Sequence, residues 1–269
     1  MEKDFSLRRP TVTIKSYMIV FLVVLAAAAM LIINSYVFGI QLVFAPVLAM
    51  LLDAIINAVK IKKITLPSSG LITGLLIALI LPPSELYIQA AAVVAAILSK
   101  HIIRIHGKHV FNPAGFGIVL VGFAAGVTAS WWASTTLLVI PLGLFLIWKL
   151  RKFVLALSFL IVYHIISAAQ AYQSITNATV LDTTAIFFAF FMLIEPLTSA
   201  IPRRAQLAEG ILVGVLVFAV NASLPRVDLF LLALLIANIF VPIFNKKLRS
   251  RTGQPAAQSS NQNKVNPSA

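Results

Sequence analysis

The sequence predicts an all-α polytopic membrane protein, with about ten transmembrane helices arranged as two inverted five-helix repeats. Three observations predict this class. The 269 residues are 60% apolar and only 11% charged, with a mean hydropathy of +1.00, whereas a soluble domain carries roughly 25% charged residues. Basic residues gather in every second connection between apolar segments. One short apolar segment that ends at proline recurs at the same place in both halves.

Ten apolar segments are candidates for membrane spans. They comprise residues 17–36, 40–59, 69–81, 86–99, 113–127, 134–148, 153–169, 183–194, 208–222 and 227–244. A helix needs ~20 residues to cross the hydrocarbon layer. Several of these segments are shorter, so the count of ten needs a second test.

The distribution of lysine and arginine supplies that test. The N-terminal stretch and every second connection hold 20 of the 21 basic residues, and the other connections hold only Arg226. Basic connections face the cytosol under the positive-inside rule. We therefore expect a multi-pass protein of the cell (inner) membrane with both termini in the cytosol. The net charge of +13 then reflects topology, and nucleic acid is not an expected partner.

The chain divides into one membrane domain between two polar ends. We expect a cytosolic segment over 1–16, a membrane domain over 17–245 with repeats at 17–127 and 134–244, and a disordered cytosolic tail over 246–269, which is rich in Gln, Asn, Ser and Pro. Trp131 and Trp132 fall in an outside connection, where amphipathic rings favour the headgroup level.

The third and eighth segments share a pattern. Both are apolar and end in Leu-Ile-x-Pro, at Pro82 (followed by Pro83) and at Pro196. The two segments are five positions apart in the order of spans, an odd number, so they run in opposite directions, as an inverted repeat requires. Proline ends a helix, and carbonyls left unpaired in the membrane must face protein, water or a ligand. Such paired breaks point to a transport site; alternatively, each proline simply ends its helix at the membrane surface.

Two acidic residues are candidates for an ion pathway. Glu195 follows a long uncharged run and precedes Pro196 and Thr198, and an ionisable group near the end of a span is a functional candidate. A surface pair with Arg203 or Arg204 is the structural alternative. Asp53 lies within the second span and could act with Asn57, one helical turn away, or make a structural hydrogen bond.

Other polar residues fit structural roles. Asp182 and Asn112 precede predicted helices and suit the N-cap position. His101, His106 and His109 lie in a basic cytosolic connection without nearby carboxylates, so we predict no metal site. That connection and the helix after Asn112 could instead attract phosphate or anionic lipid. No nucleotide-binding glycine loop or hydrolase motif is present, so no catalytic residues of an autonomous enzyme are expected.

Three stretches in order resemble the NqrB/RnfD family, the flavin-bearing integral subunits of sodium- or proton-linked redox complexes. They are Ser69–Leu79 with the following Leu81-Pro82-Pro83, Lys108–Ala114, and Phe191–Ser199, where family members usually have Asp in place of Glu195. The resemblance covers roughly residues 65–215, and the ten-span plan fits the whole chain.

The resemblance implies a subunit of a membrane electron-transport complex, with a fold similar to that of channel-like urea transporters. It implies FMN or another flavin, for which the candidate residues are Ser69, Gly70, Thr73, Gly74, Lys108, Asn112 and Thr128. Family members with covalent FMN use a threonine in a Ser-Gly-Ala-Thr type motif in the outside loop after the fifth span. This chain lacks that motif, so we expect a flavin that is bound non-covalently, or none.

Three functions follow. The first is a subunit of a redox-driven translocase, which would work with other subunits and not as an autonomous enzyme. The second is a stand-alone channel or transporter for a small solute, such as a flavin or a cation. The third is a passive membrane scaffold for partner proteins.

Overall fold

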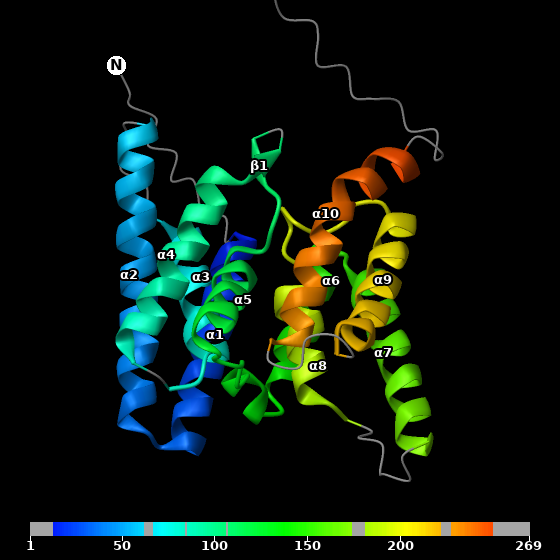
Figure 1. Ribbon diagram of the computed structural model, residues 1–269, viewed down its shortest axis with the longest axis horizontal. Helices are drawn as coiled ribbons and strands as arrows, with labels where there is room; N and C mark the ends of the chain where they lie inside the picture. Colours follow the sequence, from blue (N-terminus) through cyan, green and yellow to red (C-terminus); the bar gives the residue numbers. More distant parts are fainter. Residues whose placement is uncertain are drawn as a thin grey trace, which may run out of the picture.

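The computed structural model describes residues 13–61, 67–83, 85–105, 107–173, 181–221 and 227–249, which form a helical bundle (Figure 1). Most of the predicted tail and of the predicted N-terminal segment lie outside these residues, as does His106. The first four tail residues, 246–249, are helical and extend α10, so the tail begins later than predicted. The α-helices are α1 (Ile14–Ile33), α2 (Tyr36–Ile61), α3 (Ser68–Ile80), α4 (Leu86–Ile102), α5 (Pro113–Ala125), α6 (Val139–Leu150), α7 (Phe153–Gln173), α8 (Thr183–Phe187), α9 (Arg203–Asn221) and α10 (Leu229–Arg249).

Short elements complete the described part of the chain. Strands β1 (Arg104–Ile105) and β2 (Lys108–His109) pair in an antiparallel hairpin. A 3-10 helix, η1, covers Trp132–Thr135, and a π-helix, η2, covers Phe188–Met192. The hairpin lies at the end of the molecule where α2 and α10 terminate (Figure 1).

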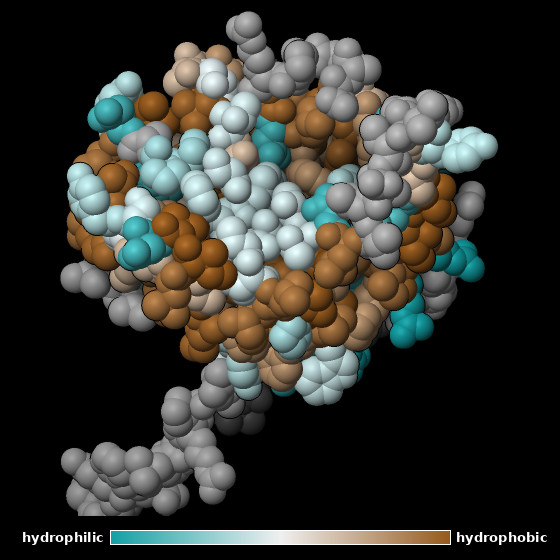
Figure 2. Space-filling model, turned by 90° about the horizontal axis from the view of Figure 1, so that it is seen from below, coloured by the Kyte–Doolittle hydropathy of each residue, from teal (hydrophilic) through white to brown (hydrophobic). Residues whose placement is uncertain are grey.

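The helices confirm an all-α membrane protein. Four are long and apolar enough to cross a bilayer: Ile14–Ile33, Tyr36–Lys60, Phe153–Tyr172 and Leu229–Leu248. Their outer faces expose large apolar side chains, such as Leu31 and Ile165, which would be unfavourable in water. Seen from below, hydrophobic residues form a broad ring around a paler centre (Figure 2).

Five further apolar helices are shorter, among them α3 and the α8–η2 segment. The 13 residues of α3 extend ~20 Å, less than the ~30 Å hydrocarbon layer. Both segments are almost wholly buried inside the protein. A helix that ends within the membrane is tolerated where protein surrounds it, so burial explains how these short segments fit.

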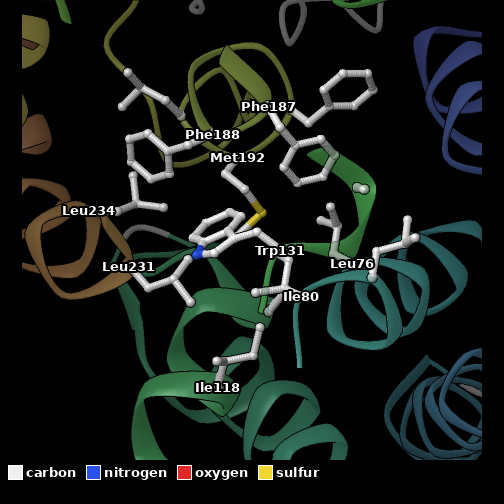
Figure 3. Close-up of a cluster of buried hydrophobic side chains, with 14 of the residues drawn as sticks. Leu76, Ile80, Ile118, Trp131, Phe187, Phe188, Met192, Leu231 and Leu234 are labelled. Carbon is white, nitrogen blue, oxygen red and sulfur yellow. The ribbon is translucent and has the colours of Figure 1, made fainter. Parts of the chain in front are cut away.

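The two short segments meet in one apolar cluster. Figure 3 shows Leu76 and Ile80 of α3 facing the same cluster as Phe188 and Met192, with Trp131 between them. Side chains of α5 and α10, including Ile118 and Leu231, close the cluster from the other side. Residues far apart in the sequence thus form a single core.

Trp131 corrects one expectation. It is 6% exposed and its indole N–H donates to Asp228 Oδ2 at 2.7 Å, so it does not lie at the headgroup level. The connection after α5 folds inward, and the N–H groups of Ser130 and Trp131 donate to the carbonyl of Ile80. The indole follows its backbone into the core, where Asp228 satisfies its only polar atom.

Some predicted boundaries also shift. The sixth helix begins at Val139 because η1 occupies the preceding residues. The ninth begins at Arg203 and not at residue 208. The eighth segment changes from α- to π-helical at Phe188. The predicted N-caps are confirmed: Asp182 accepts from Thr184 N and Ala185 N, and Asn112 accepts from Gly115 N.

Candidate functional site

The eighth segment ends at a sharp break. Leu193 N still donates to the carbonyl of Phe188, as in a π-helix, and the chain then leaves the helix at Glu195 and Pro196. π-helical turns are uncommon and occur often at functional sites. The Glu195 carbonyl accepts from Thr198 N, Ser199 N and Ser199 Oγ. A tight turn therefore holds the Glu195 backbone in place.

The Glu195 side chain pairs with a histidine. His109 Nε2 lies 3.0 Å from Glu195 Oε1, and Thr198 Oγ1 donates to Oε2 at 3.3 Å. The side chains of His109 and Glu195 are 6% and 21% exposed. Thr198 is buried. The arrangement is a partly accessible carboxylate beside an imidazole, a pair that can take up and release a proton or bind a cation.

Two asparagines, the N-cap residue of α5 and a residue of α10, bind the chain at this break. Asn112 Nδ2 donates to the carbonyl of Met192, and Asn112 N donates to Asn238 Oδ1. Asn238 Nδ2 in turn donates to the carbonyl of Thr198. The two asparagines are 1% exposed. The end of η2, the turn after Glu195 and the N-terminus of α5 therefore form one hydrogen-bonded unit.

A cavity of about 190 Å³ adjoins the pair. Its lining includes Lys108, His109, Pro196, Thr198 and Asn238. Three predicted site residues, Lys108, Pro196 and Thr198, thus meet at one place, next to Glu195. The cavity has room for a hydrated ion or a small anion. Small-molecule pockets for larger ligands usually span ~300–1,000 Å³.

A second cluster of charges surrounds Asp53. Lys100 Nζ donates to both carboxylate oxygens at 2.8 Å, and His101 Nε2 lies 2.9 Å from Oδ1. Asp53 is 1% exposed. The predicted partner Asn57 is not among these contacts, because α4 supplies an ammonium and an imidazole that the buried carboxylate binds instead. The Lys100–Asp53 salt bridge joins α4 to α2.

A third polar group lies behind the turn. Lys152 Nζ donates to Ser199 Oγ and to the carbonyl of Ala200, while Glu209 Oε2 accepts from Ala200 N. Lys152 is 6% exposed and Glu209 is fully buried. Burial lowers the pKa of the Lys152 ammonium to about 8, against the opposing attraction of Glu209. These two side chains hold the end of the turn, at Ser199 and Ala200, through separate hydrogen bonds.

The break at the end of α3 is built differently. Gln41 Nε2 donates to the carbonyls of Ala78 and Leu81, and the backbone of 130–131 binds the carbonyl of Ile80. These carbonyls before Pro82 and Pro83 are therefore satisfied by protein donors. No salt bridge among the described residues lies at this break.

The predicted flavin residues do not converge on one place. Gly70 and Gly74 face α2, where a Cβ atom would collide with backbone atoms of Ala49, Ala45 and Pro46. Close packing of α2 against α3 thus accounts for both glycines. Thr73, on the same helix, donates from Oγ1 to the carbonyl of Ser69.

The remaining members of the set lie apart. Asn112 and the exposed Thr128 lie at opposite ends of α5, whose 13 residues extend about 20 Å. Lys108 is on the hairpin at the Asn112 end. Among the described residues, no group of three or more His, Cys, Asp or Glu side chains could hold a metal ion.

Several residues of the site could not be anticipated. Sequence reasoning groups His109 with the basic connection, and its pairing with Glu195 crosses 86 positions of sequence. A signal for Glu209 does exist, since it is an acid in an apolar stretch. The roles of Lys152 and Gln41 could not be predicted from the sequence. A lysine in a basic connection and a single glutamine in a span are both common in membrane proteins without any part in a site.

These features define a polytopic α-helical membrane protein in which two buried helices break at proline and one break carries an ionisable pair. Comparison with known families places the chain in the NQR2, RnfD, RnfE family, whose profile matches residues 7–140 and 121–253. The chain belongs to this family.

Individual relatives agree. The RnfD-type subunit of the ion-translocating oxidoreductase complex of Escherichia coli strain Crooks is 24% identical over 333 aligned positions, which cover 87% of this chain and 93% of the relative. The protein of the same name from Haemophilus ducreyi is 26% identical over 141 positions, which cover 50% of this chain and 40% of the relative. The first alignment is longer than this chain, so that relative carries segments that this chain lacks.

Proposed function

We propose that this protein is an RnfD-type membrane subunit of an ion-translocating oxidoreductase complex and that it works with other subunits of that complex. The family match over residues 7–253 carries the proposal. Relatives of this name align with most of the chain. The apolar outer faces of the helices fit a bilayer environment.

The proposed topology is ten spans in two inverted five-helix repeats, similar to urea transporters, in the inner membrane with cytosolic termini. Equivalent contacts in the two halves support it: α4 packs against α5 and α9 against α10, while α2 packs against α4 and α7 against α9. Asn112 and Asp228, which precede the last helix of each half, both accept hydrogen bonds from the first turn of that helix. The alternating basic connections give the orientation.

Glu195 and His109 are the proposed exchange point for the ion. Both are largely enclosed, both lie beside a cavity that Thr198 also lines, and α10 fixes the surrounding turn. A carboxylate that gains or loses a proton or cation here changes the local charge next to Lys108. Asp53, the second carboxylate proposed for the pathway, holds Lys100 in a salt bridge between α2 and α4.

The residues proposed for a flavin do not fit one flavin. Every polar atom of the Asn112 side chain already binds protein, α2 fills the space beside Gly70 and Gly74, and Thr128 is at the far end of α5. A non-covalent flavin stays a proposal that needs a different set of residues, and no electron-transfer step is derived through it.

The test is purification of the tagged protein from its own cells in mild detergent. We expect other redox subunits to co-purify, and any flavin to be released into the supernatant after acid denaturation. Isolation without partner chains, together with solute uptake by liposomes that contain this protein alone, would instead favour a stand-alone transporter.

The Glu195→Gln variant tests the proposed role of Glu195 in ion transfer. Ion-coupled electron transfer by the complex should fall, while complex assembly is retained. Glu85→Gln is the matched control, since Glu85 is an exposed acid before α4 with no side-chain cap bond. Equal activity of the two variants would remove Glu195 from the proposed pathway.

A further inference from the structure

A second cavity, larger than the one beside Glu195, opens where α6 ends and α9 begins. Its volume is about 1080 Å³. The residues that carry the argument are Lys149, Arg151, Arg203, Gln206 and Asn245, together with Trp148. Ile201 and Asn245 line both cavities, so the two adjoin. The proposed function gives this larger cavity no role.

The charged side chains described around this cavity are all positive. Lys149, Arg151 and Arg203 line it, and none of the described residues that line it is acidic. The salt bridges in the described part of the chain involve none of these three cations. Like charges gathered around a hollow repel one another unless an anion lies between them. The cavity therefore suits a negatively charged group.

The backbone positions two of these cations. Arg151 adopts a left-handed conformation, with φ of 56°, and its N–H donates to the carbonyls of Ile147 and Trp148. This cap ends α6 and starts α7 within two residues. The tight turn leaves the exposed Arg151 side chain at the rim of the cavity, which Arg203 also lines from the start of α9.

Two amides add hydrogen-bonding groups. Asn245 Oδ1 accepts from Ile201 N, which orients the Asn245 amide and leaves its Nδ2 group as a donor. Gln206 is 4% exposed; its Nε2 donates to the carbonyl of Ile201, and its Oε1 is buried without a partner among the described residues. A ligand hydroxyl is the kind of donor that this oxygen lacks.

The walls of the cavity are apolar toward the membrane. Trp148 is 60% exposed, Ile201 65% and Phe153 39%. A soluble phosphate compound would gain nothing from such a wall, whereas acyl chains would cover it. Tryptophan at the end of a span is also typical of the headgroup level of the bilayer. The combination of cations, a hydroxyl acceptor and a lipid-facing wall fits one class of ligand.

We propose that this cavity binds the headgroup of an anionic glycerophospholipid with free hydroxyl groups, of which phosphatidylglycerol is the simplest. The phosphodiester lies between Arg151 and Arg203, the headgroup hydroxyls face Gln206 and Asn245, and the acyl chains run along Trp148 and Ile201. This inference depends on the membrane location of the chain and not on its redox role.

The test is calorimetric titration of the detergent-purified protein with short-chain phosphatidylglycerol, and with short-chain phosphatidylcholine for comparison. We expect selective binding of phosphatidylglycerol. Arg151→Gln with Arg203→Gln should weaken it about 25-fold, because each arginine near a membrane surface contributes about a fivefold factor. Arg204→Gln is the matched control, since Arg204 is an exposed neighbour on α9 outside the cavity lining.

Each single arginine variant is measured as well. The single variants still test the proposal if the double variant does not fold. Equal binding of the two lipids, or unchanged binding by the double variant, would overturn the proposal. Full competition by inorganic phosphate at constant ionic strength would also overturn it, in favour of a soluble phosphate compound.

Discussion

The two helix breaks share a sequence pattern but differ in chemistry. At the end of α3, neutral Gln41 and the backbone of residues 130–131 bind the terminal carbonyls. At the end of η2, Glu195 pairs with His109 beside a cavity, and the buried side chains of Lys152 and Glu209 hold the turn. A proline-ended segment therefore specifies where a helix stops, and the residues brought to that point decide whether the break is structural or ionisable.

The largest expected effect concerns the charges behind the second break. Glu209→Leu or Lys152→Met should each lower the free energy of unfolding by about 3 kcal/mol, because each removes a buried polar side chain and leaves its hydrogen-bond partners unsatisfied. Glu209 also holds Ala200 N. Thermal unfolding in detergent measures the loss. The double variant should recover part of it, and a double variant as unstable as the sum of the single variants would contradict the coupling.

Gln41→Leu probes the first break. It removes the donor to the carbonyls of Ala78 and Leu81, and unsatisfied buried acceptors cost about 1–3 kcal/mol. We expect a stability loss of about 2 kcal/mol with unchanged ion-coupled activity per folded molecule. Unfolding midpoints and activity are measured on the same preparation. A loss of activity at full stability would show that the α3 break is functional too.

Glu195→Gln should change activity and not stability, whereas Gln41→Leu should change stability and not activity. Its side chain is 21% exposed and glutamine can still hydrogen bond, so the stability cost should stay below about 1 kcal/mol. If Glu195 transfers a proton, its loss should reduce the coupled rate by about 100-fold. Glu195→Asp should keep most of the activity, because it retains a carboxylate. Aspartate is also the residue that the family resemblance leads us to expect at this position. Sodium-dependent or proton-dependent turnover of the purified complex distinguishes these outcomes.

The smallest effect is expected at Thr128. It is exposed on the connection after α5, so Thr128→Ala should change stability by no more than about 0.5 kcal/mol. Any flavin in the preparation should remain, since we propose non-covalent binding. A flavin that stays with the acid precipitate of the unsubstituted protein and disappears in Thr128→Ala would identify a covalent attachment.

Much of the fold is predictable because its signals are local. The sequence locates α3, α5 and the α8–η2 segment within a few residues, and it identifies the caps at Asn112 and Asp182 correctly. A helix start depends on the few residues around it. The prediction for Trp131 is wrong for the converse reason: a connection of given composition can fold outward or inward, and its hydrogen bonds to Ile80 and Asp228 are distant in sequence.

The candidate site is predictable in part. Glu195, Pro196 and Thr198 can be identified together because they are adjacent, and the structure places all three around one turn. Their partners His109 and Asn238 come from other elements. Asp53 can be identified, but its partners Lys100 and His101 on α4 cannot, since spacing along a helix reveals only neighbours three and four residues apart.

The sequence by itself determined that the chain lies in a lipid bilayer, in which order its helices follow, and to which family it belongs. Hydropathy and the position of basic residues act segment by segment, so they can be read along the chain. Only the tertiary structure decided that one break is closed by a glutamine and the other by a histidine–glutamate pair. The physical reason is that a buried polar atom takes whichever partner packing brings within hydrogen-bond distance, and packing joins residues that the chain keeps far apart.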